Sequence, residues 1–497
     1  MRSLAATATL LILTACVAWS ALTGAAAGRH IAGIGLLVYL LIERRHLGPN
    51  ARRMMRFVQW TLLVVLIVPP LPGVDGPLSS MTGQDRLAVR SAKLLQALDD
   101  AGMLIGLFTA LNMLRDAAQS SALLQRCGSV LVRQPPGRRF LALSLGAHLV
   151  GLVLNFGVLP LLGTMVVRGN SLAAAGGDPE IVAIRQQRMM TALMRGFALM
   201  TVWSPLSVSF AVTEAVVPGV NWARLLPLQG LLTILLLALA WGLDRRAFPP
   251  RLVVPQGGRD PEPGDGAAVG KMLALVLGVV GLSVAMAHLV HVRLIEGAMV
   301  VVPVAAWLWL AVQRALPSLS AVGWGRALVG AVPELGRRLR VSLPEARNEV
   351  AILGGSLFLG SLLGSWIPSS ALAWLVETLH LPALALAIML SFSVIVLARL
   401  GISQLITVTL IGHALSHLTG LGLNPAVLAS GLMAVWSLSI CVTTVGAAVL
   451  WIARMSDVPI AKAGWGWNAA YVVIGAVVVA VWMIGLSFVP GLSLAPS

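Results

Sequence analysis

An arginine in the middle of a long apolar segment is the residue with the clearest chemistry. Arg399 lies within the apolar run 382–417, where a charge costs at least about 2.5–3.5 kcal/mol at the bilayer centre. A guanidinium offers a planar pair of donors to a carboxylate, sulfonate or phosphate, so we predict that Arg399 binds an anionic substrate. The alternative is an internal ion pair with Asp99, Asp100 or Glu349.

The same three carboxylates are candidate proton carriers, because acids inside membranes often bind protons; Asp99 is expected near a helix end in headgroup water. His413 and His417 stand one helical turn apart, a spacing that suits a metal pair. No third ligand is evident in the sequence, so no metal site is predicted. Nucleotide-binding, phosphate-loop and hydrolase motifs are absent from the sequence, and we do not predict an enzyme.

Two parts of the chain repeat the same landmarks in the same order. The stretch 199–204 (LMTVWS) matches 432–437 (LMAVWS). Before each lies a long apolar segment that is interrupted near its middle, at 155–157 and at 399–401. Earlier still, Asp100 and Glu349 each lead into a glycine-containing helix. This order predicts a duplicated membrane unit.

These two interruptions, together with helix breaks expected at 203–207 and 436–439, supply the other predicted site residues. Pro205 removes a backbone donor and frees carbonyl groups, while a glycine past each tip permits a positive φ. Ser403 and Gln404 open a helix whose free N–H groups favour an anion. Serines that bond back to their own helix are the alternative. No catalytic or metal-binding residue is predicted, and the predicted substrate-binding residues are Asn155, Gly157, Ser204, Pro205, Ser207, Arg399, Gly401, Ser403, Gln404, Ser437, Ser439 and Thr443.

Composition places these residues in a membrane protein. The chain is 58% hydrophobic and 11% charged, against about 25% charged residues in soluble proteins. Apolar runs long enough to cross about 30 Å of hydrocarbon recur along it, and we interpret the first, 4–22, as a membrane helix rather than a signal sequence. The net charge of +16 comes from arginines between these runs, where they set topology and meet anionic headgroups, so nucleic-acid binding is not predicted. The three cysteines are scattered and predict no disulfide framework.

The arginine pattern predicts the topology of the two interrupted segments. If 140–167 crossed the membrane once, every later basic loop would lie outside, against the positive-inside rule. We therefore predict a re-entrant hairpin that enters from the cytoplasm, with its tip near Asn155. The segment 382–417 is flanked by stretches without lysine or arginine, which predicts a second hairpin entering from the periplasm. The two units are thus inverted, and their irregular backbone is expected to meet near the midplane.

The predicted fold class is an all-α polytopic membrane protein with two inverted-topology repeats, each containing a re-entrant hairpin and a discontinuous helix, plus N-terminal scaffold helices. Residues 1–93 form the scaffold helices, and 94–250 form repeat 1. Residues 251–345 form connecting helices and a basic cytoplasmic loop, and 346–497 form repeat 2.

This plan resembles the ion transporter superfamily of secondary carriers, which includes the divalent anion:sodium symporters and the large membrane subunits of tripartite dicarboxylate transporters. The likeness covers about 94–486 and rests on architecture. It implies an elevator carrier, in which a transport domain slides against a dimeric scaffold and the tips and breaks hold substrate and coupling ions. Dicarboxylate members carry Ser-Asn-Thr at both tips, whereas this chain reads LNF at 154–156 and ARL at 398–400, so only Asn155 matches. Neither sodium coupling nor a dicarboxylate substrate is carried over.

The sequence therefore predicts a secondary active transporter of a small organic anion in the bacterial inner membrane, coupled to H⁺ or Na⁺ and needing no other cofactor. The expected partners are that anion, the lipid bilayer and a second copy of the chain in a homodimer. One alternative is a sodium/proton antiporter, which would favour carboxylates at the tips. Another is an intramembrane enzyme or lipid-carrier handling protein, which would need His or acid clusters in one aqueous cavity.

Overall fold

The computed structural model describes residues 2–67, 83–248, 265–315, 321–364, 377–416 and 422–492, together with positions 366 and 374. Throughout these ranges the regular structure is helical. Eight helical segments of the described chain are long and apolar enough to cross a membrane. The predicted all-α polytopic fold class is therefore confirmed.

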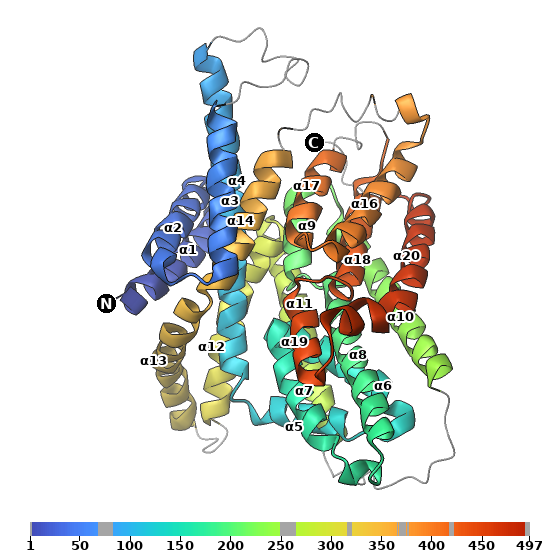
Figure 1. Ribbon diagram of the computed structural model, residues 1–497. Helices are drawn as coiled ribbons and strands as arrows, with labels where there is room; N and C mark the ends of the chain where they lie inside the picture. The colour runs from blue at the N-terminus through green and yellow to red at the C-terminus, as the bar shows by residue number, and fades with distance from the viewer. Residues whose placement is uncertain are drawn as a thin grey trace.

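One side of the molecule is assembled around a long central helix, on the left in Figure 1. This helix is α4 (Gly83–Ala118), and α1, α2, α12, α13 and α14 all pack against it. We call this group, with α3, the α4 unit. Its other helices are α1 (Arg2–Thr23), α2 (Ala27–Glu43) with η1 (Arg44–His46), α3 (Pro49–Ile67), α12 (Leu294–Ala315), α13 (Ala321–Glu345) and α14 (Arg347–Gly364). Helix α11 (Asp265–Val290) packs against α12 on one side and against α5 (Ala122–Val132) and α6 (Pro136–Leu154) on the other.

The other side, which we call the hairpin unit, contains both interrupted segments (Figure 1). Its first copy, preceded by α5 (Ala122–Val132), comprises α6 (Pro136–Leu154), η3 (Asn155–Gly157), α7 (Val158–Gly169), η4 (Ala173–Ala175), α8 (Pro179–Trp203), α9 (Val208–Val216) and α10 (Trp222–Ala247). Its second copy comprises α16 (Ala383–Arg399), α17 (Gln404–Ser416), α18 (Pro425–Ile440), α19 (Ala447–Ser456), η6 (Lys462–Gly466) and α20 (Trp467–Leu486).

The segment 140–167 folds back on itself at its predicted tip. Helix α6 runs beside α8, because the Ser144 hydroxyl donates to the Ala192 carbonyl at 3.1 Å and Trp203 bonds His148 one turn later. After η3 the chain returns, and the side chain of Asn170, just past α7, donates to the Val182 carbonyl at 2.9 Å near the start of α8. Both ends of the hairpin thus lie at one end of α8, and its tip lies at the other.

The two copies are inverted relative to each other. In Figure 1 the α6–α7 hairpin lies in the lower half and the α16–α17 hairpin in the upper half, while α8 leads up to α9 and α18 leads down to α19. The packing partners repeat this relation: α6 lies on α8 as α16 lies on α18, and α10 lies on α8 as α20 lies on α18. The returning arms cross over between copies, because α7 packs on α19 and α17 packs on α9.

The second discontinuous helix breaks later than the sequence predicts. The serines of 436–439 lie inside α18, and the irregular segment is 441–446. In the first copy Pro205 has no N–H to continue the helix and holds Ser204 extended, with ψ at 125°. The position that corresponds to Pro205 in the second copy is Leu438, which continues α18. The predicted break was therefore wrong by about one helical turn.

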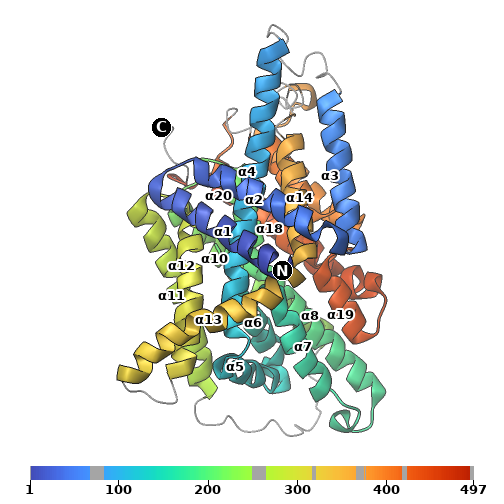
Figure 2. The ribbon, with the colours of Figure 1, turned by 90° about the vertical axis from the view of Figure 1, so that its left-hand side faces the viewer.

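The predicted basic loop within 251–345 is in part a helix, α13. Its arginines are exposed or half-buried, and Leu335, Leu339 and Leu343 are buried beneath it. This amphipathic pattern fits a helix at a polar–apolar boundary. Figure 2 shows α13 running obliquely across the lower ends of the upright helices.

The predicted metal pair cannot be followed to its second member, because His417 lies outside the described residues. His413 packs close to Gly364 of α14, where an added Cβ would lie 2.5 Å from the His413 Cβ. No group of three His, Cys, Asp or Glu side chains suited to a metal occurs among the described residues.

Candidate functional site

The first hairpin tip is built by Asn155, Phe156 and Gly157. Asn155 takes the strained backbone conformation, with φ at 50°, and its N–H donates to the Gly151 carbonyl. Asparagine tolerates a positive φ better than most residues, and Gly157, predicted to supply it, has φ at −58° instead. The half-buried Asn155 side-chain amide makes no hydrogen bond to the described residues. It is therefore free to bind a ligand.

An arginine of the α4 unit reaches this tip. A Cβ added to Gly157 would lie 3.8 Å from Cδ of Arg115, so the glycine leaves room for the arginine stem. The Arg115 Nε lies 3.7 Å from a carboxylate oxygen of Asp116, and that carboxylate also accepts from the Ser342 hydroxyl of α13. The tip therefore has a cation beside it that the sequence did not reveal.

The serines at the break between α8 and α9 hydrogen-bond to nearby backbone groups. The Ser204 hydroxyl accepts from the Leu206 N–H at 3.1 Å. The Ser207 hydroxyl donates to the Ser204 carbonyl at 2.8 Å and accepts from the Phe210 N–H at 3.2 Å, which caps α9. Both serines and Pro205 are buried. These contacts shape the break and orient the N-terminus of α9.

A histidine joins this break to the first hairpin, and sequence reasoning missed it. The Trp203 Nε1–H donates to Nε2 of His148 at 2.8 Å, and the two rings stack with centroids 5.9 Å apart. This bond assigns the ring proton of a neutral His148 to Nδ1. The pairing lies between residues 55 positions apart, so only the helical register of α6 against α8 could have signalled it.

The second tip presents Arg399 without an internal partner. The guanidinium makes no ion pair or hydrogen bond to the described residues, and it is half-buried. Two of the proposed acids have other partners: Asp99 lies 2.7 Å from His30, and Asp100 accepts from Ser361 at 2.9 Å. The internal-pair alternative is therefore wrong for both.

The remainder of the second tip is open and turns through a glycine. Gly401 has φ at 93°, as the sequence predicts. Its neighbours Leu400 and Ile402 are 73% and 42% exposed. Ser403 and Gln404, at the start of α17, are half-buried, and their side chains make no hydrogen bond to the described residues.

The second break lies against this tip. The Thr444 N–H donates to the Ala398 carbonyl at 3.4 Å, and a Cβ on Gly401 would lie 3.3 Å from the Thr444 hydroxyl. Thr443, one residue earlier, is buried and accepts weakly from the Val445 N–H at 3.4 Å. Thr443, one of the predicted site residues, therefore lies in the irregular segment itself.

The two serines before this break differ. The Ser439 hydroxyl donates to the Trp436 carbonyl of its own helix at 2.7 Å. This serine therefore serves its own helix, which was the alternative to ligand binding. Ser437 is 1% exposed, and its hydroxyl has no partner among the described residues. A buried hydroxyl without a partner is costly, so Ser437 is the stronger ligand candidate of the two.

The predicted site residues form two halves. Tip one adjoins the end of α8, and tip two adjoins the second break; no hydrogen bond or ion pair among the described residues joins the tips to each other. Each half contains an arginine and an unpartnered amide: Arg115 with Asn155, and Arg399 with Gln404. Four helices also begin at the irregular segments, namely α7, α9, α17 and α19. Helix N-termini and guanidinium groups both favour an anion.

Comparison with known proteins relates this fold to that of a solved transporter. No protein-family model and no curated protein matches the sequence. Among solved structures, the chain is similar to the YdaH transporter of Alcanivorax borkumensis, whose crystal structure is described as revealing an unusual topology. The TM-score is 0.52 at 14% identity, over 88% of this chain and 99% of that one. This chain therefore shares the fold of a membrane transporter.

Proposed function

We propose that this chain is a secondary active transporter of a small organic anion across the bacterial inner membrane. It works by an elevator-type alternating-access mechanism, is coupled to H⁺ or Na⁺, acts as a homodimer and belongs to the ion transporter superfamily. The proposal rests mainly on the irregular backbone of the two inverted copies, where helices begin and where Arg399 lies. Irregular backbone at membrane depth is tolerated where it binds a ligand or lines a cavity.

The charge at this site indicates the class of substrate. Arg399 has no carboxylate partner among the described residues, so a bound anion would supply the charge that the protein does not. A guanidinium binds a carboxylate, sulfonate or phosphate through two parallel hydrogen bonds. The unpartnered amides of Asn155 and Gln404 add donors that an anion can use.

The packing between the two units supports relative movement. Helix α14 of the α4 unit lies on α17 of the hairpin unit through Gly360 and Gly364. A Cβ on Gly360 would lie 2.4 Å from the Thr409 side chain, so the two helices approach very closely. Small residues allow such close approach in membranes without interlocking side chains, which favours sliding of α17 along α14.

Substitution of Arg399 tests the proposal on purified protein. The probes are libraries of organic carboxylates, sulfonates and phosphates, and the readout is the melting temperature with and without each compound. We expect at least one class to stabilise the wild type, Arg399→Gln to abolish that stabilisation, and Arg399→Lys to retain part of it. Without ligand, Arg399→Gln should lower stability by less than about 1 kcal/mol, since breaking a buried ion pair would cost about 3–5 kcal/mol.

Arg168→Gln is the matched control, because Arg168 is exposed at the far end of the first hairpin. The stabilising anion would then be followed into proteoliposomes under proton or sodium gradients. Stabilisation that survives in Arg399→Gln would remove this residue from the site. Failure of every anion class to stabilise or enter with the wild type would refute anion transport.

A further inference from the structure

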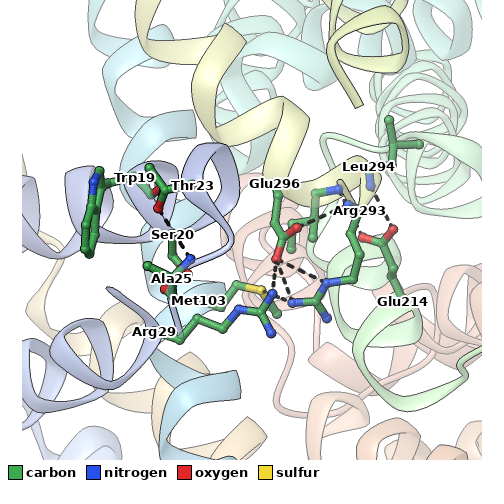
Figure 3. A network of polar contacts seen from close by, with 11 residues as sticks. Trp19, Ser20, Thr23, Ala25, Arg29, Met103, Glu214, Arg293, Leu294 and Glu296 are labelled. Atoms are coloured by element: carbon green, nitrogen blue, oxygen red, sulfur yellow. Dashed lines mark hydrogen bonds and ion pairs between the residues drawn. The ribbon is translucent and has the colours of Figure 1, made fainter. Parts of the chain in front are cut away.

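A buried carboxylate joins the hairpin unit to the α4 unit (Figure 3). Glu214 is the acidic residue of α9, the short helix after the first break, and it is 7% exposed. Its two oxygens accept hydrogen bonds from the N–H groups of Leu294 and Ile295, both at 3.0 Å. These are the first two residues of α12. One unit therefore supplies the acceptor, and the other supplies both donors.

A second carboxylate nearby belongs wholly to the α4 unit. Glu296 accepts from the guanidinium of Arg29 at 3.0 Å and from the backbone and side chain of Arg293 (Figure 3). Arg29 is on α2, and Arg293 directly precedes α12. These three groups stay together if the hairpin unit moves, so Glu296 keeps its cations in every position of that unit.

The surroundings of Glu214 contain few other charges. Arg293 and Glu296 are the charged groups that act on it electrostatically. Among the helices that pack against α9, α18 has no ionisable residue. The others carry Asp100 of α4, which accepts from Ser361, Arg195 of α8, which bonds Asn468, and His413 of α17, besides further ionisable residues of α4 and α8. Helix α9 itself carries no cation.

Docking and charge are therefore linked at Glu214. While α9 lies on α12, the two N–H groups, the positive helix end and Arg293 stabilise the ionised carboxylate against the cost of its burial. If α9 leaves with the hairpin unit, the carboxylate loses both donors in an apolar setting. An ionised carboxylate without partners is very costly there, and binding one proton removes the charge.

We propose that Glu214 is the proton-binding residue of this transporter, ionised while α9 is docked on α12 and protonated when the hairpin unit has moved away. The inference rests on the proposed function, and it names the coupling ion that the proposal leaves open. One proton adds to the carboxylate from the aqueous phase that the undocked unit faces, and on docking it returns to the aqueous phase on the opposite side of the membrane. Each cycle of the unit then moves one proton equivalent.

Spin–spin distance measurements on the purified full chain in nanodiscs, without substrate, test this proposal. Labels on Ile234→Cys of α10 and Val304→Cys of α12 report the separation of the two units, since both positions are well exposed, at 62% and 47%. The native Cys16, Cys127 and Cys441 are replaced by alanine. We expect acidification to raise the population at a second distance several-fold in this background, and Glu214→Gln to show that population at every pH.

Glu296→Gln is the matched control, since it lies in the same network but on one unit only; it should keep the pH dependence. Infrared difference spectra between high and low pH should contain a protonated-carboxyl component in the wild type that is missing from the same difference in Glu214→Gln. A melting curve checks that the variants are folded. Two distances that respond to pH equally in Glu214→Gln and the wild type would overturn the proton site and leave the transporter proposal intact. A single distance at every pH in all variants would count against both.

Discussion

Replacement of Gly196 by alanine should separate α6 from α8. A Cβ at Gly196 would lie 2.1 Å from the carbonyl oxygen of Ser144 and 2.7 Å from its Cα. Real Cβ contacts are essentially never shorter than 3.0 Å, and here the neighbours are backbone atoms that cannot rotate away. The first hairpin must therefore withdraw from α8 by about 1 Å.

The size of the effect follows from the contacts at this crossing. Overpacking of a tight interface costs about 1–3 kcal/mol. The hydrogen bond from Ser144 to the Ala192 carbonyl, 3.1 Å long, is lost with the displacement, at about 1 kcal/mol. The higher helix propensity of alanine than of glycine offsets about 1 kcal/mol of this loss. The expected net loss is about 1–3 kcal/mol of stability.

Thermal and denaturant unfolding in mild detergent, followed by tryptophan fluorescence, measures this loss. Gly242→Ala on α10 is the control, because nothing lies within 4 Å of the added Cβ and only the propensity gain should appear. Equal unfolding midpoints for the two variants would refute the close packing of the first hairpin on α8.

Two further substitutions address the second tip and the surface helix. Gly401→Ala places a side chain at a φ of 93°; it should cost about 1–2 kcal/mol in the same unfolding assay, and an unchanged midpoint would show that the turn relaxes freely. Hydrogen bonds from Arg337 lower the pKa of Glu334 on α13. A lowered pKa adds stability above the unfolded-state pKa that is lost as the pH falls through the folded-state value. Glu334→Gln should therefore reduce the acid sensitivity of the melting temperature, and identical pH profiles for variant and wild type would contradict this.

Much of the fold could be predicted from the distribution of arginines along the sequence. This distribution predicted two hairpins of opposite entry, and the structure places their turns at Asn155 and Gly401. The physical reason is that charge in loops and hydrophobicity in spans act on each segment separately, so both can be read without knowing the neighbours.

Features that depend on contacts between distant segments were out of reach. The break after α18 has no proline to mark it. Glu214 meets α12 across 80 residues and Trp203 meets His148 across 55, and neither partner has a local signature. The amphipathic period of α13 was hidden by its arginines, which resemble those of a basic loop. The placement of Arg399 at a tip was predictable; its lack of an internal partner was not.

The crossed arms of the hairpins have a consequence for how the chain is made. Helix α9 emerges from the ribosome long before α17, the arm that covers it, and α7 waits still longer for α19. Until then the first copy must enter the bilayer while the faces of α7 and α9 that pack on α19 and α17 are uncovered. Neither copy can bury all of its core alone. Biogenesis therefore ends in a single late step, in which the second copy packs on the first and both cores become buried. A chain cut between the copies is thus expected to meet quality-control proteases rather than accumulate as a stable half.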